Sequence, residues 1–348
     1  MTAYPDFIPV NMITGFLGSG KTTLLQGLLK SPRLANTAVL INEFGEVGLD
    51  HLLLERVDEE TVVMQSGCIC CTIRSDLSEA IRELYGKRER GEVPPFDRLV
   101  IETTGLADPA PIVFTLMAEP VIRHHFRLGN IVTTVDAVNG ALHLRDNPES
   151  VKQVAVADRL VLTKTDIAKE DRAEEIRAEL RRLNPSAPIF DAAADGVEPD
   201  DLLTSDLYDP AGKTEEVQLW LREEALKDAH PARAQDVNRH DRRIHAFCLT
   251  FDEPLDWTAF GIWLTMLLHA HGEDVLRVKG LLNVRDMPAP VVIHGVQHVI
   301  HPPVHLDRWP DADHRSRIVF IVRDLEQAVI EASLAAFNRL GEAEGRAA

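Results

Sequence analysis

The chain has 348 residues, of which 45% are hydrophobic and 26% charged, and its formal net charge at pH 7 is −18. This length favours two globular domains, and no apolar run approaches the ~20 residues of a membrane span. The acidic balance disfavours nucleic acid and anionic lipid as partners, and the amino-terminal residues lack a secretory signal, so we expect a soluble cytoplasmic protein.

Apolar runs typical of strands recur through the first half of the chain. They cover residues 7–14, 37–41, 61–64, 98–101, 131–135 and 159–162. Helical patterns separate several of them, the first at residues 22–30. Strands that alternate with helices predict an α/β domain, with a mainly parallel sheet covered by helices on both faces.

The composition changes near residue 210. We predict a first domain over residues 1–212, a polar and charged interdomain segment over 213–241, and a second domain over 242–340. In the second domain, strand patterns cover residues 243–251, 275–284, 290–300 and 317–322, and helical patterns cover 257–271 and 325–340. This mixture predicts a smaller α+β domain at the carboxyl end.

Residues 15–22 (GFLGSGKT) match the P-loop pattern of nucleoside triphosphatases, and they stand between a predicted strand and a predicted helix. Glycines there let backbone N–H groups turn inward around phosphate, Lys21 would reach the outer phosphates, and Thr22 would hold Mg²⁺. The predicted nucleotide-binding residues of this segment are Gly15, Gly18, Ser19, Gly20, Lys21, Thr22 and Thr23. The alternative is a coincidental glycine-rich turn, but the flanking strand and helix favour a P-loop domain.

A second segment, at residues 102–105 (ETTG), also follows an apolar run. Glu102 stands where the acidic residue on the Mg²⁺ side is expected in such enzymes, and Gly105 stands where a glycine senses the γ-phosphate. We therefore predict Lys21, Glu102 and Gly105 as the catalytic group. The alternative is a capped turn that only starts a helix.

The third segment determines which base is bound. Thr163, Lys164 and Asp166 resemble the guanine-specificity motif, usually Asn-Lys-x-Asp, with threonine in place of asparagine. The aspartate accepts hydrogen bonds from two guanine nitrogens that adenine does not present as donors, and the lysine packs along the ring. A strand that ends in a polar turn can produce the same letters, but the distance from the P-loop favours guanine.

Three of the four cysteines fall within four residues, at Cys68, Cys70 and Cys71. Adjacent cysteines pair poorly with each other, so a disulfide inside the cluster is disfavoured. Thiolates suit Zn²⁺ and Cu⁺, and a tetrahedral zinc would need a further ligand. Glu43 and Glu46, in the loop before the cluster, are the candidates for it. Buried inert cysteines, a redox thiol pair and a merely solvated acidic loop are the alternatives.

Histidines concentrate late in the chain, with nine of the 14 at or after His240. They include His294, His298, His301 and His305. Alternate strand positions tolerate histidine, so we predict ordinary surface or core residues and assign no metal ligand among them.

Together these segments resemble the CobW/YjiA family of metal-handling P-loop GTPases. The resemblance rests on the P-loop, residues 42–48, 67–71, 102–105 and 163–166. It extends to residues 96–102, 157–159, 276–280 and 295–297, and so spans nearly the whole chain.

The resemblance implies a GTPase domain joined to a CobW-type carboxyl-terminal domain, slow intrinsic GTP hydrolysis, and delivery of a transition metal, commonly zinc or cobalt. By position it implies phosphate contact for Lys21, Mg²⁺ contact for Thr22 and Glu102, guanine reading for Lys164 and Asp166, and metal thiolates at Cys68, Cys70 and Cys71. Two features depart from the family: Ile41 stands where some relatives place a metal-binding glutamate, and residues 213–241 contain no histidine-rich linker.

The leading hypothesis is a metallochaperone in which GTP and Mg²⁺ order the loops at residues 42–48 and 103–108 and thereby control a Zn²⁺ or Co²⁺ site between them. The expected partners are guanine nucleotide, a transition metal ion and a metal-receiving client protein, and a nucleotide- or metal-dependent homo-oligomer stays open. The rivals are a regulatory GTPase with an incidental or redox cysteine cluster, a metal-storage module, and an ATP-dependent small-molecule kinase.

Overall fold

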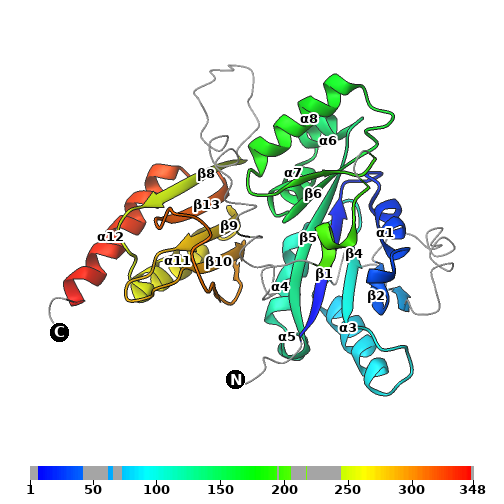
Figure 1. The fold of residues 1–348 in the computed structure, drawn as a ribbon, viewed down its shortest axis with the longest axis horizontal. Coiled ribbons are helices and arrows are strands. Elements are labelled where there is room, and N and C mark those ends of the chain that lie inside the picture. Colours follow the sequence, from blue (N-terminus) through cyan, green and yellow to red (C-terminus); the bar gives the residue numbers. More distant parts are fainter. Residues whose placement is uncertain are drawn as a thin grey trace. The chain divides into compact units, whose positions relative to one another are not determined.

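The computed structural model describes residues 7–41, 62–65, 73–193, 196–204, 217 and 244–345. Two compact units make up the chain, the first carrying strands β1 to β7 and the second strands β8 to β13 (Figure 1). None of the helices in the described ranges is both long enough and apolar enough to span a membrane.

The first unit is built on a seven-stranded sheet in the order β3-β2-β4-β1-β5-β6-β7. All of its strand pairs are parallel. The strands are β1 (Ile8–Gly15), β2 (Thr37–Ile41), β3 (Val62–Gln65), β4 (Arg98–Glu102), β5 (Phe126–Asp136), β6 (Arg159–Thr163) and β7 (Ile189–Asp191). The predicted α/β class is confirmed, and the sheet is wholly parallel rather than mainly so.

Helices cover the first sheet on both faces, as Figure 1 shows with α1 on one side of the strands and α4 on the other. The helices are α1 (Lys21–Leu29), α3 (Ile73–Glu89), α4 (Pro109–Ala118), α5 (Pro120–His125), α6 (Gly140–Asp146), α7 (Pro148–Ala155) and α8 (Glu170–Leu183), with a short 3-10 helix η1 (Pro32–Leu34) and a short π-helix η2 (Asp200–Thr204). Leu25, Leu28 and Leu29 of α1 pack with Leu202 and Leu203 of η2 over alternate strand residues. The leucines at helical spacing in α1 therefore form its buried face, as predicted.

Two features of this sheet were not predicted. Strand β5 begins at Phe126 instead of residue 131, and the short β7 at Ile189–Asp191 was missed. Glycine and asparagine are common in turns, but here Gly129 and Asn130 lie within a strand. A Cβ on Gly129 would come within 2.5 Å of the Asn11 Oδ1, and that oxygen accepts from the Asn130 backbone N–H at 2.8 Å.

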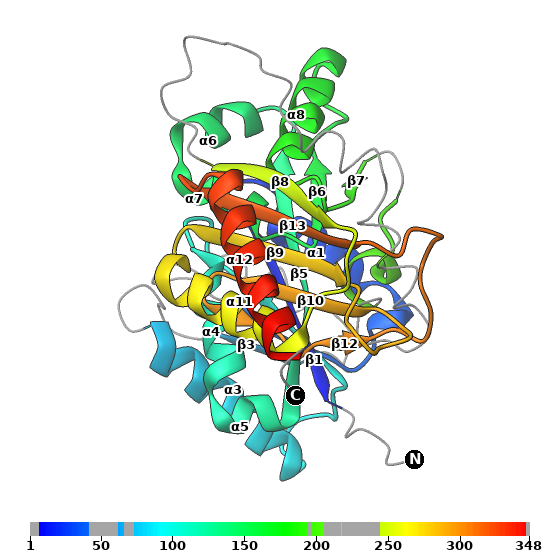
Figure 2. The same ribbon diagram turned by 90° about the vertical axis from the view of Figure 1, so that its left-hand side faces the viewer.

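The second unit holds an antiparallel sheet in the order β11-β10-β9-β13-β8, with β12 paired to β10. Figure 2 shows α11 and α12 lying over the same face of this sheet. Their apolar side chains, including Phe260, Trp263 and Ile330, form one core with strand residues such as Phe247 and Phe320. The elements are β8 (Ile244–Phe251), α11 (Trp257–His271), β9 (Val275–Leu282), β10 (Val291–Val296), β11 (Val299–Ile300), β12 (Val304–His305), β13 (Ser316–Arg323) and α12 (Gln327–Gly345). The smaller α+β domain is thus confirmed as a fold.

One strand prediction in this unit was wrong. Residues 290–300 were read as a single strand, but they form a hairpin in which β10 and β11 pair at Val296 and Val299. The turn passes through Gln297, whose φ of 50° lies in the left-handed region. The turn residues Gln297 and His298 are neither glycine nor proline, so the strongest turn signals are absent at the point where the chain reverses.

The predicted interdomain segment at residues 213–241 lies outside the described residues except for Val217. That residue is fully buried and packs with Cys248, Leu281 and Val292 of the second unit. The domain boundaries themselves stay a prediction.

Candidate nucleotide-binding site

The loop between β1 and α1 has the backbone that phosphate binding requires. Gly18 and Gly20 have φ values of 69° and 90°, in the left-handed region that favours glycine, and the Ser19 N–H donates to the Phe16 carbonyl at 3.1 Å. Helix α1 begins directly after Gly20. The loop therefore curls around the amino end of a helix, where backbone N–H groups and the helix dipole favour an anion.

Gly15 is fixed by its neighbours as well as by its φ of 140°. A Cβ built on it would stand 2.4 Å from both the backbone oxygen and the Oγ1 of Thr134, and 2.7 Å from the Ser19 Oγ. Thr134 and Ser19 in turn share a hydrogen bond of 2.6 Å. No side chain fits between β1, β5 and the loop at this point.

We therefore expect Gly15→Ala to lower the free energy of unfolding by about 2–4 kcal/mol, through overpacking and backbone strain together. The matched control is Gly27→Ala, at an exposed position of α1 where a Cβ meets nothing within 4 Å. That substitution should be neutral or stabilise by up to about 1 kcal/mol, because alanine favours a helix. Urea unfolding measures both, and a Gly15→Ala protein as stable as the parent would contradict the packing argument.

Lys21 opens helix α1 and turns its side chain back over the loop. Its Nζ donates to the Gly15 carbonyl at 3.0 Å and to the Phe16 carbonyl at 3.2 Å. The ammonium is thus held against the loop by backbone oxygens, at the point where the outer phosphates would lie. A phosphate oxygen bound there would gain a charge-assisted hydrogen bond without a large movement of the side chain.

Thr22 and Glu102 come together at the same end of the sheet. The Thr22 hydroxyl donates to the Glu102 Oε1 at 2.5 Å, and the Glu102 side chain is buried at the end of β4. A hydroxyl and a carboxylate beside a phosphate loop are the hard oxygen donors that Mg²⁺ prefers. The residues present therefore fit a magnesium ion, held by Thr22 and Glu102, which would supply charge neutralisation at the phosphates.

Gly105 lies directly against the phosphate loop. A Cβ built on Gly105 would stand 2.6 Å from the backbone nitrogen of Leu17 and 2.7 Å from its Cα. Thr103, two residues earlier, holds this segment against β1. Its backbone N–H donates to the Ile13 carbonyl at 3.0 Å, and its hydroxyl donates to the Thr14 hydroxyl at 2.8 Å. Only glycine lets the loop of residues 103–108, called the sensing loop below, come this close to the phosphate loop.

Thr163 connects residues 163–166, the predicted base-reading segment, to the phosphate loop. Its hydroxyl, at the end of β6, donates to the Ser19 carbonyl at 2.8 Å and lies 3.3 Å from the Val135 carbonyl. Its side chain also lies 3.5 Å from the Cβ position of Gly20. Threonine at the first motif position is thus accommodated by a direct bond to the phosphate loop.

Lys164 and Asp166 follow Thr163 at the edge of the sheet. Lys164 has a φ of 60°, and its Nζ donates to the Asp136 Oδ2 at 2.7 Å. Burial alone would raise the pKa of the Asp136 carboxyl, but hydrogen bonds from Lys164 and from the Val138 and Asn139 backbone hold this pKa below its usual range. Asp166 is exposed to solvent, so its carboxylate is accessible to a ligand.

A buried carboxylate braces this turn from behind. Asp191, at the end of β7, accepts from the Thr165 hydroxyl at 2.6 Å and from the Arg177 Nη2 at 2.5 Å. It also accepts from the Ala193 N–H at 3.0 Å. Thr165 stands between Lys164 and Asp166, so these bonds fix the backbone from which both side chains extend.

The structure thus brings together the phosphate loop, Glu102 with Gly105, and the residues after β6. The predicted metal ligands Cys68, Cys70, Cys71, Glu43 and Glu46 lie outside the described residues. The strands that lead into these segments are described, however. Ile41 at the end of β2 pairs with Gln65 at the end of β3 and with Glu102 at the end of β4.

Three residues of the site were missed in the sequence: Asp136, Asp191 and Gln153. Asp136 and Asp191 each end an apolar run, and in a parallel sheet such positions lie at the carboxyl edge where ligands bind. That signal could have found the two aspartates. Gln153 lies within a helix with no motif around it, and only its contacts, described below, show its place.

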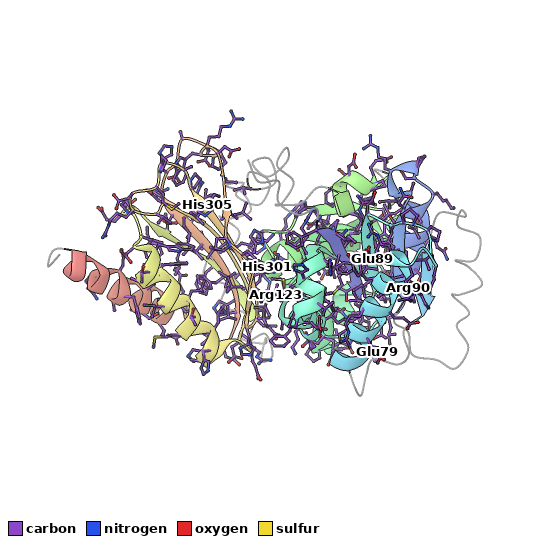
Figure 3. All side chains as sticks on the ribbon, turned by 90° about the horizontal axis from the view of Figure 1, so that it is seen from below. Glu79, Glu89, Arg90, Arg123, His301 and His305 are labelled. Carbon is purple, nitrogen blue, oxygen red and sulfur yellow. The ribbon has the colours of Figure 1, made fainter. Side chains whose placement is uncertain are left out.

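The histidines of the second unit form no metal site within the described residues. The rings of His294 and His301 are 6.1 Å apart, but no group of three or more histidine, cysteine or acidic residues there could hold a metal. His301 is buried and His305 exposed, and both are labelled in Figure 3. Their assignment as ordinary core and surface residues stays a prediction.

Comparison with known proteins identifies both units. Residues 9–191 match the CobW/HypB/UreG nucleotide-binding domain. The chain belongs to the CobW/HypB/UreG family. Residues 244–338 match the cobalamin synthesis protein CobW carboxyl-terminal domain, so the predicted combination of the two domains is confirmed.

Several relatives of this CobW-family chain resemble it over nearly its whole length. The zinc chaperone YjiA of Escherichia coli is 32% identical over 333 residues, covering 95% of this chain and 99% of its own. The zinc-regulated GTPase metalloprotein activator 1 of Schizosaccharomyces pombe is 29% identical, covering 92% and 84%. A crystal structure of zinc-bound YjiA GTPase from E. coli aligns with 95% of this chain and 99% of its own at 28% identity, with a TM-score of 0.70.

Proposed function

We propose that this chain is a GTP-hydrolysing metallochaperone. In this proposal it binds a transition metal, zinc or cobalt, at Cys68, Cys70 and Cys71, with Glu46 or Glu43 as a further ligand. It transfers the metal to a client protein under the control of the bound nucleotide. Slow intrinsic GTP hydrolysis resets the cycle.

The observation that carries the proposal is the register of three neighbouring strands. Gln65, Ile41 and Glu102 end β3, β2 and β4 and lie side by side in the sheet. Adjacent strands are about 4.8 Å apart, so Gln65 and Glu102 are separated by roughly two such spacings. The cysteines start three residues after Gln65. A metal held by them would therefore lie near the Mg²⁺ side of the nucleotide site.

The relatives support the same function. YjiA is named a zinc chaperone, and the fission yeast protein is named a zinc-regulated GTPase metalloprotein activator. The crystal structure also names YjiA a GTPase with zinc bound, so both names join zinc and a GTPase in a protein that matches more than nine-tenths of this chain. Cobalt stays an alternative because the two metals accept similar tetrahedral thiolate sites.

We assign each residue of the nucleotide site a part in this cycle. Lys21 and the amides of the phosphate loop would bind the phosphates and stabilise the charge that develops as the terminal phosphoryl group leaves. Gly105 would contact that group through its backbone N–H, so the sensing loop differs between the GTP and GDP states. Lys164 and Asp166 would select guanine. The change in the sensing loop is then passed to the adjacent strand ends and to the cysteines.

The test is a metal titration in both nucleotide states. Zn²⁺ and Co²⁺ affinities are measured by competition with a chromophoric chelator, with GTPγS and Mg²⁺ or with GDP and Mg²⁺ bound. We expect the two states to differ about tenfold or more, within the usual range of coupling free energies. Reciprocity requires Zn²⁺ to change the ratio of GTPγS to GDP affinity by the same factor, and equal metal affinities in both states would reject the coupling.

The cysteine cluster is tested separately. Cys70→Ser should abolish stoichiometric Zn²⁺ binding, because a serine hydroxyl is a poor zinc ligand. The matched control is Cys248→Ser, which replaces a buried cysteine of the second unit that forms no disulfide. If Cys70→Ser binds zinc as the parent does, the regulatory GTPase with an incidental cluster becomes the better reading. If Lys21→Ala changes neither nucleotide binding nor metal release, a metal-storage module becomes the better interpretation.

A further inference from the structure

Helix α7 holds the sensing loop through one buried side chain. The Gln153 Nε2 donates to the Gly105 carbonyl at 3.2 Å and to the Ala107 carbonyl at 2.9 Å. Gln153 is fully buried. One carboxamide thus fixes two carbonyls on either side of Leu106, in the loop that lies against the phosphate loop.

A second contact extends this attachment. The Lys152 Nζ donates to the Asp108 Oδ2 at 2.8 Å, and the other carboxylate oxygen of Asp108 caps helix α4 by accepting from the Ala110 N–H at 3.1 Å. Neighbouring residues of α7 therefore hold the middle and the end of the sensing loop.

The platform for these contacts is itself fixed. The Thr133 hydroxyl of β5 donates to the Gln153 carbonyl at 2.8 Å, and α7 packs on β1. The chain leaves α7 at Ala155 and enters β6 at Arg159, the strand that ends at Thr163. One short element thus connects the sensing loop to the base-reading segment.

The Gln153 carboxamide buries one oxygen without a hydrogen bond in the described part of the chain, which is unfavourable and which packing alone does not explain. The Gln153 Oε1 is buried and accepts no hydrogen bond from the described residues. Its amide cannot be turned over, because two carbonyl oxygens face the other end and require a donor. An apolar side chain of the same size would avoid the unsatisfied oxygen, so the two donated bonds are what distinguishes glutamine here.

We infer that Gln153 is the positioning residue that presents Gly105 to the terminal phosphate of GTP, an inference that rests on the proposed GTPase function. Holding the Gly105 and Ala107 carbonyls toward α7 fixes the orientation of the peptide groups beside Leu17. The loop is then ordered before nucleotide binds, and less conformational entropy is lost when its N–H meets the γ-phosphate. GDP lacks that phosphate and gains nothing from this order.

The experiment compares GTPγS and GDP affinities, each with Mg²⁺, by calorimetry on the full chain. Gln153→Met keeps the length of the side chain and removes the donors. It should lower GTPγS affinity about tenfold while leaving GDP affinity unchanged, since loss of the ordering bonds is felt only where the loop contacts the ligand. Lys152→Met should act in the same direction but less, because that ion pair is partly solvated.

The control is Asn130→Leu, which removes another buried carboxamide donor, to the Leu202 carbonyl at 2.9 Å, away from the sensing loop. It should lower stability to urea without changing the ratio of GTPγS to GDP affinity. If Gln153→Met also leaves that ratio unchanged, Gln153 is only structural and the inference is overturned. If the parent chain binds neither nucleotide, the proposed function fails instead, so the two failures are distinguishable.

Discussion

Lys21→Ala is expected to weaken guanine nucleotide binding by a factor of about a hundred or more. The ammonium lies against the phosphate loop, where it donates to the Gly15 and Phe16 carbonyls. Charge-assisted hydrogen bonds to phosphate are worth about 1.5–3 kcal/mol each, and losing two of them corresponds to at least that factor. Equilibrium binding of a fluorescent GTP analogue measures the loss directly.

The control for this substitution is Lys30→Ala, which removes an exposed ammonium from the residue directly after α1. It changes the net charge equally and leaves the phosphate loop intact, so nucleotide affinity should stay as in the parent. Urea unfolding of both variants separates a binding defect from a folding defect. A Lys21→Ala protein that binds GTP as tightly as Lys30→Ala would show that residues 15–22 are not a phosphate loop.

The parallel sheet was predictable from the sequence because its strands are buried on both faces. Fully buried strands such as β2 (Thr37–Ile41) and β6 (Arg159–Thr163) are continuous apolar runs, and their edges fall within one residue of the predicted ones. The start of β5 was not predictable, since Asn11, Gly129 and Asn130 are polar or small. The carboxamides of Asn11 and Asn130 donate hydrogen bonds to residues distant in the chain, the Leu203 and Leu202 carbonyls of η2.

The candidate site likewise contains residues that the sequence predicts and residues that it does not. Motif residues such as Lys21, Glu102 and Thr163 were named from spacing alone, because phosphate and Mg²⁺ require particular groups at fixed offsets from a strand and a helix. The residues that hold them in place were not named. Gln153 acts through backbone carbonyls that carry no side-chain signature, and Asp191 acts through Thr165, at the variable position of the motif. Supporting contacts of this kind depend on the fold rather than on a local pattern.

Asp166→Asn is expected to change which base the site selects. A carboxylate accepts from the ring N–H and the amino group of guanine, whereas the carboxamide of asparagine offers one acceptor and one donor. Guanine should then bind about a hundredfold more weakly, because one polar pair becomes a clash between two donors. Xanthine carries a carbonyl oxygen in place of the amino group, so it pairs with asparagine and should be preferred. Competition of GTP, XTP and ATP against a bound fluorescent nucleotide ranks the three.

Hydrogen bonds of its neighbours hold the turn around Asp166, so this substitution tests base selection separately from folding. Asp166 is exposed, and the backbone of its turn is held by Thr165 on Asp191 and by Thr163 on the phosphate loop, so the substitution should leave the turn in place. Asp171→Asn is the matched control, an exposed carboxylate in the first turn of α8, and it should keep the guanine preference. If Asp166→Asn still prefers GTP over XTP, another residue reads the base. If the parent binds ATP as tightly as GTP, the small-molecule kinase becomes the better reading.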